Sequence, residues 1–191
     1  MRIGIFGGSF NPPHNMHKNI SLELIDNGYL DKVIYVPTGN MYNKSNLIDF
    51  KDRLNMVKLM IQKNDNLDVS NIGNNMDYQY TYQALDYFKK LYNDASIYFI
   101  CGSDNLVEFD TWREFEYILE NYKLLVIIRN GDNIEEILSK YDKYRDNIII
   151  TNVSPRVISS TVVRHNIKND IGDDNIDIDV YKYIKEKKLY K

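Results

Sequence analysis

The sequence predicts an α/β protein with a central parallel sheet and helices on both of its faces. Short runs of β-branched and aromatic residues alternate along the 191 residues with amphipathic segments of helical period. The runs are almost continuously apolar over four to six residues, as is typical of strands buried on both faces of a parallel sheet. Because parallel strands are joined by right-handed crossovers, the alternating order indicates a layered architecture.

The strands are predicted from these apolar runs, of which RIGIF, KVIYV and SIYFIC are typical. Their expected ranges are 2–6, 32–36, 96–101, 123–128 and 147–150, with a weaker candidate at 67–72.

The helices are predicted from apolar residues that recur on one stripe, such as Leu85, Phe88 and Leu91. Their expected ranges are 16–27, 49–63, 81–92, 111–119, 134–141 and 179–188. Gly28 is expected to stop the first helix, and Thr111 with Glu114 to form a capping box at the start of the fourth. The acidic, asparagine-rich stretch 166–179 is expected to be a mobile loop.

Composition narrows the class of protein. The 24 Lys and Arg residues against 27 Asp and Glu residues give a net charge of -3, which favours neither nucleic acid nor an anionic membrane. The single cysteine, Cys101, can form neither an internal disulfide nor a cysteine metal site. No segment approaches the ~20 apolar residues of a membrane span, and the first residues make a poor secretion signal. We therefore expect a cytoplasmic, single domain over 1–191, with a C-terminal helical part at about 159–191.

The first candidate site follows the first predicted strand directly. Ligands of open α/β sheets bind beyond the carboxyl ends of strands, and adjacent glycines leave backbone N–H groups open to a phosphate. Neither the dinucleotide fingerprint nor the P-loop is present. His14 and His17 are two of the chain's 3 histidines, and they can donate hydrogen bonds to a phosphoryl group. The alternative is that one of them only caps or packs the helix. The candidate residues before these histidines are Gly7, Gly8, Ser9 and Phe10.

The second candidate site lies near the other end of the sequence. Ser159, Ser160 and Thr161 are consecutive hydroxyl residues, and Arg164 follows within one helical turn. The hydroxyls can simply cap a helix, or they can join Arg164 in binding phosphate oxygens. Capping alone does not require Arg164.

The two motifs GGSFNPPHNMH and ISSTVVR together resemble those of the HxGH-type nucleotidyltransferases, and specifically the nicotinate and nicotinamide mononucleotide adenylyltransferases. The resemblance covers roughly residues 1–166 and implies a Rossmann-like nucleotidyltransferase fold. Further matching segments are PTGN at 37–40, Lys44, RLNM at 53–56, Tyr80 with Thr81, FICGSD at 99–104, Trp112 and VIIR at 126–129.

This resemblance implies a reaction in NAD biosynthesis. AMP passes from ATP to nicotinate mononucleotide, pyrophosphate leaves, and Mg²⁺ accompanies the ATP phosphates without a metal site of the protein's own. His14, His17 and Arg164 would act on the phosphates. The other residues implied for ATP are Gly7, Gly8, Ser9, Phe10, Gly102, Asp104, Ser159, Ser160 and Thr161. Those implied for the mononucleotide are Asn40, Lys44, Thr81, Tyr82, Trp112 and Arg129.

Departures from the family pattern leave alternatives open. Met16 stands where most members have glycine, residues 41–43 replace a Pro-Pro-His, and Gln79 replaces a serine. The nicotinamide mononucleotide and phosphopantetheine adenylyltransferases are therefore alternative activities, and a non-catalytic nucleotide-binding module is an alternative of another class. A homo-oligomer is left open.

Individual residues also have structural alternatives. Asp104 could cap a helix and Trp112 could belong to the core. Lys44 and Arg129 could be surface ion-pair partners.

Overall fold

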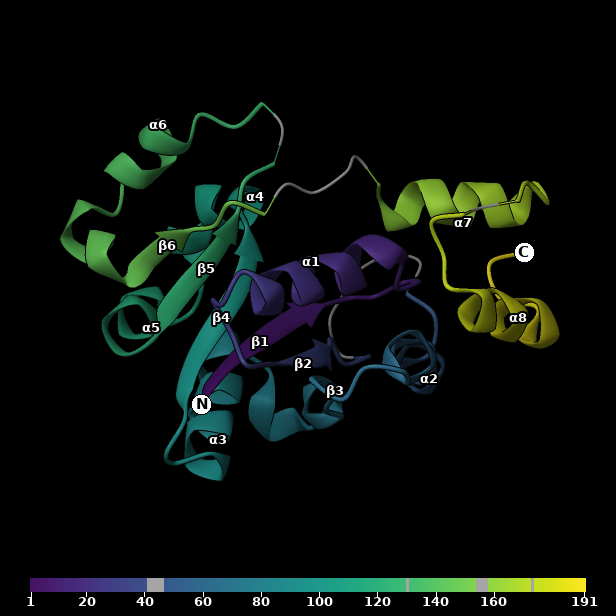
Figure 1. Ribbon diagram of the computed structural model, residues 1–191, viewed down its shortest axis with the longest axis horizontal. Helices are drawn as coiled ribbons and strands as arrows, with labels where there is room; N and C mark the ends of the chain where they lie inside the picture. Colours follow the sequence, from purple (N-terminus) through teal and green to yellow (C-terminus); the bar gives the residue numbers. More distant parts are fainter. Residues whose placement is uncertain (41–46, 130, 154–157, 173) are drawn as a thin grey trace.

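The computed structural model describes residues 1–40, 47–129, 131–153, 158–172 and 174–191. Within these ranges the chain forms a six-stranded parallel sheet with the strand order β3-β2-β1-β4-β5-β6 (Figure 1). This is the strand order of the doubly wound dinucleotide-binding fold. The strands are β1 (Arg2–Gly8), β2 (Lys32–Pro37), β3 (Leu67–Val69), β4 (Ser96–Gly102), β5 (Lys123–Ile127) and β6 (Ile148–Ile150).

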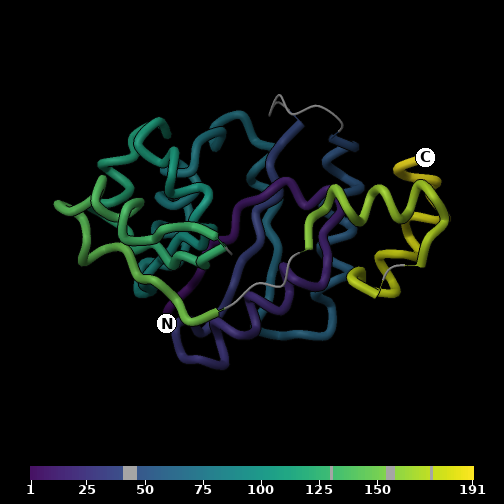
Figure 2. Tube along the Cα trace, turned by 90° about the horizontal axis from the view of Figure 1, so that it is seen from above, coloured from purple at the N-terminus to yellow at the C-terminus, as the bar shows by residue number. Residues whose placement is uncertain are grey.

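Helices connect these strands and extend beyond the last one. The α-helices are α1 (Asn15–Asp26), α2 (Phe50–Ile61), α3 (Thr81–Leu91), α4 (Ser103–Val107), α5 (Phe115–Asn121), α6 (Ile134–Ser139), α7 (Ser160–Lys168) and α8 (Ile178–Lys187). Short 3₁₀ turns are η1 (Ile72–Asn74), η2 (Met76–Tyr78), η3 (Phe109–Thr111) and η4 (Asp142–Asn147). Figures 1 and 2 both place α7 and α8 at one end of the molecule and α5 and α6 at the other.

Two apolar cores lie on the two faces of the sheet. Along β5, Leu124 and Val126 belong to one core while Leu125 and Ile127 belong to the other, as alternation in a strand requires. Helices α3, α4, α5 and α6 contribute to the first core, and α1, α2, α7 and α8 to the second. The predicted sheet with helices on both faces is therefore confirmed.

One predicted helix start is wrong. The chain over 111–114 does not begin an α-helix, because Thr111 closes η3 by donating its hydroxyl to the Glu108 carbonyl at 2.7 Å. Glu114 then takes a left-handed backbone with φ 57° and precedes α5, so the predicted capping box does not form. The Trp112 N–H donates to the Phe109 carbonyl, and the Trp112 ring packs on the Phe109 ring. These two contacts hold the segment outside an α-helix.

Other predicted boundaries shift by a few residues. Strand β1 extends through Gly7 and Gly8, because both pair with β2, so these glycines end the strand rather than follow it. Strand β3 stops at Val69, short of the predicted 72. The stretch 166–179, expected to be a loop throughout, begins inside α7 and ends inside α8.

The topology positions the functional edge of the sheet. Strand β1 lies between β2 and β4, so the crossovers leave it in opposite directions and a crevice forms beyond its carboxyl end. Gly8 ends β1 and Gly102 ends the adjacent β4. Two of the three predicted ATP segments, those at Gly8 and at Gly102, therefore begin at the same edge.

Candidate active site

The loop of residues 9–14, here called the opening loop, joins β1 to α1. Phe10 has a left-handed backbone with φ 45°, and its ring is buried over the end of β1. A Cβ atom on Gly8 would lie 3.1 Å from this ring, so a side chain at this position would crowd the ring. The Asn11–Pro12 peptide bond is cis. The loop is thus packed down on the sheet and holds Ser9 and Phe10 at its edge.

His14 and His17 lie at the start of α1. The His14 backbone N–H donates to His17 Nδ1 at 3.1 Å, which leaves the proton of a neutral His17 ring on Nε2. Burial lowers the pKa of His17 well below its usual value, and the charges of His14 and Arg129 lower it further. His17 is therefore a neutral hydrogen-bond donor at physiological pH.

An aromatic cluster surrounds the His17 ring. The Phe10 ring meets it edge-on with centroids 5.0 Å apart, and the Phe6 ring lies 6.0 Å away. Beneath them, the buried Tyr35 of β2 donates its hydroxyl to the His17 carbonyl at 2.9 Å, and Ser21 bonds to both. His17 is consequently held in place both by the contacts of its ring and by the bonds to its backbone carbonyl.

The start of α7 meets the opening loop, as Figure 2 shows in the view from above. Ser160 Oγ donates to the Pro12 carbonyl at 2.9 Å, and Arg164 Nη1 donates to the Asn11 carbonyl at 2.7 Å. Arg164 Nη2 reaches Thr161 Oγ1 at 3.0 Å. Ser159 Oγ caps α7 by accepting from the Val162 N–H, as the capping alternative predicts, and its own O–H can still donate. The two predicted phosphate motifs thus lie together in space, although the residues joined by the bond from Ser160 to Pro12 are 148 positions apart in the sequence.

The carboxyl ends of β4 and β5 carry an ion pair. Arg129 Nε lies 2.9 Å from Asp104 Oδ1, and both side chains are exposed. A Cβ atom on Gly102 would lie 2.3 Å from that same carboxylate oxygen. Gly102, not Asp104, is the N-cap residue of α4, so the capping alternative for Asp104 is wrong. The Asp104 carboxylate instead pairs with Arg129 beside Gly102, at the carboxyl end of β4.

Arg53 is a residue that the sequence analysis did not place in the site. Its side chain is fully buried in α2 and donates to the Ser9 carbonyl at 2.9 Å and to the Ile48 carbonyl at 3.0 Å. Its third contact is to Asn40 Oδ1 at 3.4 Å. Arg53 therefore links the opening loop to Asn40, a predicted mononucleotide residue. The signal in the sequence was an arginine among the apolar positions of the predicted helix 49–63.

The remaining mononucleotide candidates lie on the other core. Thr81 begins α3, and the Tyr82 ring stacks on Tyr80 with centroids 6.2 Å apart. The Trp112 ring is partly buried against Phe99 of β4 and against Phe109. Across the part of the chain that the structure describes, no hydrogen bond or ring contact joins Trp112 to α3. Lys44 lies outside the described residues.

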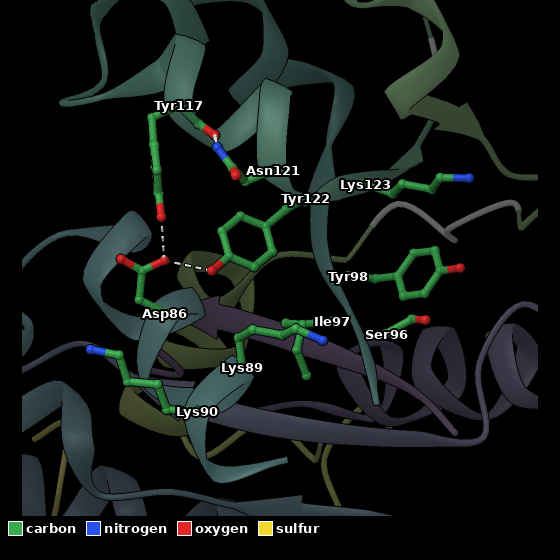
Figure 3. Close-up of a pocket in the computed structure, with 10 residues that line it drawn as sticks. All are labelled: Asp86, Lys89, Lys90, Ser96, Ile97, Tyr98, Tyr117, Asn121, Tyr122 and Lys123. Atoms are coloured by element: carbon green, nitrogen blue, oxygen red, sulfur yellow. Dashed lines mark hydrogen bonds between the residues drawn. The ribbon is translucent and has the colours of Figure 1, made fainter. Parts of the chain in front are cut away.

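A separate depression of about 700 Å³ lies at the opposite edge of the sheet (Figure 3). It is lined by the first residues of β4 and β5, Ser96 and Lys123, and none of the predicted site residues line it. Asp86 there accepts from two tyrosine hydroxyls, those of Tyr117 and Tyr122. Figure 3 shows the Lys123 amine directed away from the rest of the lining, so the basic groups do not converge on one ligand.

The fold, with α7 meeting the opening loop at the end of β1, is that of a nucleotidyltransferase. The family model of cytidylyltransferase-like proteins matches residues 5–166. Probable nicotinate-nucleotide adenylyltransferases of Clostridium acetobutylicum and Acholeplasma laidlawii are 36% and 34% identical to this chain, over 97% and 98% of it and 97% and 96% of their own lengths. The chain belongs to the nicotinate-nucleotide adenylyltransferase family, which confirms the resemblance read from its motifs.

A solved structure shows the same fold. It is described as Plasmodium falciparum nicotinic acid mononucleotide adenylyltransferase complexed with NaAD, and it is 23% identical in sequence. It superposes with a TM-score of 0.83 over 99% of this chain and 97% of its own. The predicted Rossmann-like nucleotidyltransferase fold is thus confirmed.

Proposed function

We propose that this enzyme transfers AMP from ATP to nicotinate mononucleotide, giving nicotinate adenine dinucleotide and pyrophosphate. The observation that carries the proposal is the pair of bonds joining α7 to the opening loop, from Ser160 to Pro12 and from Arg164 to Asn11. These bonds hold the Arg164 guanidinium and the Ser160 hydroxyl against the opening loop, which ends at His14. That is the donor set that a triphosphate requires.

The reaction needs alignment more than proton transfer. The attacking group is a phosphate oxygen of the mononucleotide, which is already ionised and requires no general base. It forms a bond to the α-phosphorus of ATP as the bond to the pyrophosphate oxygen breaks. The protein must therefore bring two anions together and stabilise the charge that develops between them.

His17 supports this step as a fixed donor. Burial keeps the ring uncharged at neutral pH, so Nε2 carries a proton that it can donate while Nδ1 accepts from the His14 N–H. We assign the Nε2–H to an oxygen of the reacting phosphate, where the hydrogen bond strengthens as negative charge shifts onto that oxygen.

The other residues sort by the substrate half they serve. Arg164, with Ser160 and Thr161, is assigned to the β- and γ-phosphates, which leave as pyrophosphate. Asp104 beyond β4 is assigned to the adenosine ribose. The remaining ATP contacts are assigned to Gly7, Gly8, Ser9, Phe10, His14, Gly102 and Ser159, and the mononucleotide contacts to Asn40, Lys44, Thr81, Tyr82, Trp112 and Arg129.

Mg²⁺ fits this site as a companion of the substrate. Among the described residues, no three His, Cys, Asp or Glu side chains group so as to hold a metal ion. The donors around the opening loop are imidazole, hydroxyl and guanidinium groups, which suit phosphate oxygens better than a hard cation. Bound through those oxygens, the ion would neutralise part of the triphosphate charge.

A pyrophosphate-release assay tests the activity. The enzyme is supplied with ATP and Mg²⁺ and is offered nicotinate mononucleotide, nicotinamide mononucleotide or phosphopantetheine in turn. We expect turnover with nicotinate mononucleotide. Turnover with phosphopantetheine alone would overturn the assignment, and an absence of pyrophosphate with every acceptor would favour the non-catalytic module.

The domain organisation, location and partners of the enzyme remain predictions. We expect a single domain, a cytoplasmic location and no binding to nucleic acid or membrane. None of the described helices is long and apolar enough to cross a membrane.

A further inference from the structure

The chain after α8 turns back toward the opening loop. Lys188 and Tyr190 both have left-handed backbones, with φ 55° and 63°, and the Leu189 N–H donates to the Ile184 carbonyl at 3.0 Å. Side chains disfavour this backbone region, so such residues persist where their surroundings fix them. Leu189 and Tyr190 pack on the core that holds α1, α2 and α7. The segment after α8 is thus held in one place on this core.

Tyr190 contacts the Asn11 side chain. The Tyr190 hydroxyl donates to Asn11 Oδ1 at 2.9 Å, across 179 residues of sequence. Burial raises the pKa of Tyr190 far above its usual value, against the opposing charges of Arg164 and Arg53. The hydroxyl therefore keeps its proton and remains a hydrogen-bond donor to Asn11.

Asn11 connects three parts of the site. Its side chain is buried, and Oδ1 also accepts from the Ile48 N–H at 3.4 Å, just before α2. Its backbone carbonyl accepts from Arg164 Nη1 at 2.7 Å. A change in the backbone torsions of Asn11 would move the carbonyl that accepts from this guanidinium. Tyr190 holds the side chain of the same residue, so it restrains such a change.

We propose that Tyr190 is a positioning residue of the adenylyl transfer, which holds Asn11 so that its carbonyl directs Arg164 toward the triphosphate. The inference rests on the proposed function, since it assigns Arg164 to ATP. It gives the segment 188–190 a role in ATP binding in addition to its packing on the core.

Tyr190→Phe tests the proposal because it removes the hydroxyl and keeps the ring in the core. We expect the Kd for ATP, measured by calorimetry without mononucleotide, to rise about fivefold, the scale of one hydrogen bond. The KM for nicotinate mononucleotide should not change. In an Asn11→Ala background the same substitution should add no further loss.

Tyr183→Phe is the matched control. Tyr183 lies in α8, where its hydroxyl donates to Asp52 Oδ1 at 2.7 Å and accepts from Asn55 Nδ2 at 3.2 Å, so its hydrogen bonds among the described residues run to α2 and not to the opening loop. It should lower the melting temperature much as Tyr190→Phe does and leave the Kd for ATP unchanged. An unchanged Kd in Tyr190→Phe, or an equal rise in both variants, would overturn the proposal. A wild-type enzyme that binds no ATP would instead overturn the proposed function.

Discussion

The rings of His14 and His17 lie stacked, with centroids 3.8 Å apart and planes inclined by 28°. The hydrogen bond from the His14 N–H to His17 Nδ1 adds to the stack and holds the second ring in one orientation. Two charged imidazoles at this separation would repel each other, and burial already opposes the charged form of His17. The pair is therefore arranged to keep a neutral donor in place.

Replacement of His17 by alanine should reduce turnover at least a hundredfold, equivalent to about 2.7 kcal/mol in the barrier. The loss arises because no other side chain supplies this N–H to the reacting phosphate. Steady-state pyrophosphate release measures it. His165→Ala is the control, since His165 is exposed on α7 and should keep full activity. Equal activity in the two variants would remove His17 from the reaction.

The lowered pKa of His17 predicts how stability depends on pH. In the unfolded chain the ring takes up a proton near its ordinary value of 6.5, whereas the folded chain resists protonation to a much lower pH. The unfolded state therefore binds more protons as the pH falls below about 6.5, and the free energy of unfolding decreases there. Urea unfolding at pH 5 to 8 should show this decrease in the wild type and a smaller one in His17→Gln. Parallel curves for the two proteins would contradict it.

Gly102→Ala should weaken ATP binding about tenfold, or about 1.4 kcal/mol. The added Cβ would meet Asp104 Oδ1 at 2.3 Å and Arg129 Nε at 3.1 Å, so the Asp104 carboxylate must move from its present position. Calorimetric titration with ATP checks this. Gly172→Ala is the matched control, because nothing lies within 4 Å of its added Cβ. If the Gly102→Ala enzyme binds ATP like the wild type, the ion pair of Asp104 and Arg129 does not contribute to ATP binding.

Trp112→Ala should raise the KM for nicotinate mononucleotide about tenfold and leave ATP binding intact. An indole stacks well on a pyridine ring, and this ring is only partly covered by Phe99 and Phe109. Trp112→Phe, which keeps an aromatic face, should recover most of the affinity. If the KM of the alanine variant stayed at the wild-type value, Trp112 would be a core residue alone.

Arg53→Lys should destabilise the fold by roughly 2–4 kcal/mol, because an ammonium group cannot replace the forked donors that reach Ser9 and Ile48. Chemical denaturation measures the loss. Arg113→Lys is the control, since Arg113 is exposed and only lies over the Tyr80 ring. Similar midpoints for both variants would show that the buried guanidinium contributes little.

The sheet could be predicted from the sequence because its strands are buried on both faces and so appear as continuous apolar runs. Element ends were less accessible. Gly7 and Gly8 looked like a loop, yet their backbones pair with β2. Thr111 looked like an N-cap, yet its hydroxyl bonds backward to Glu108. Both outcomes depend on neighbours that local residue preferences do not describe.

The two phosphate motifs could be recognised separately, because each has the right donors close together in sequence. Their mutual contact depends on α7 returning to the end of β1, and that return is a property of the fold. Arg53 and Tyr190 were not placed in the site for the same reason. Each contacts the opening loop through side-chain bonds that span 44 and 179 residues.

The hydroxyls of Tyr35 and Ser21 bond to the carbonyl oxygen of His17, which every amino acid has in common. The first turn of α1 is thus fastened to the middle of the sheet independently of the side chain at position 17. An enzyme without that imidazole would keep its helix in register with β2. A kinetic defect at this position therefore reports the missing imidazole, together with the bond that it accepts from the His14 N–H, and not a displaced helix.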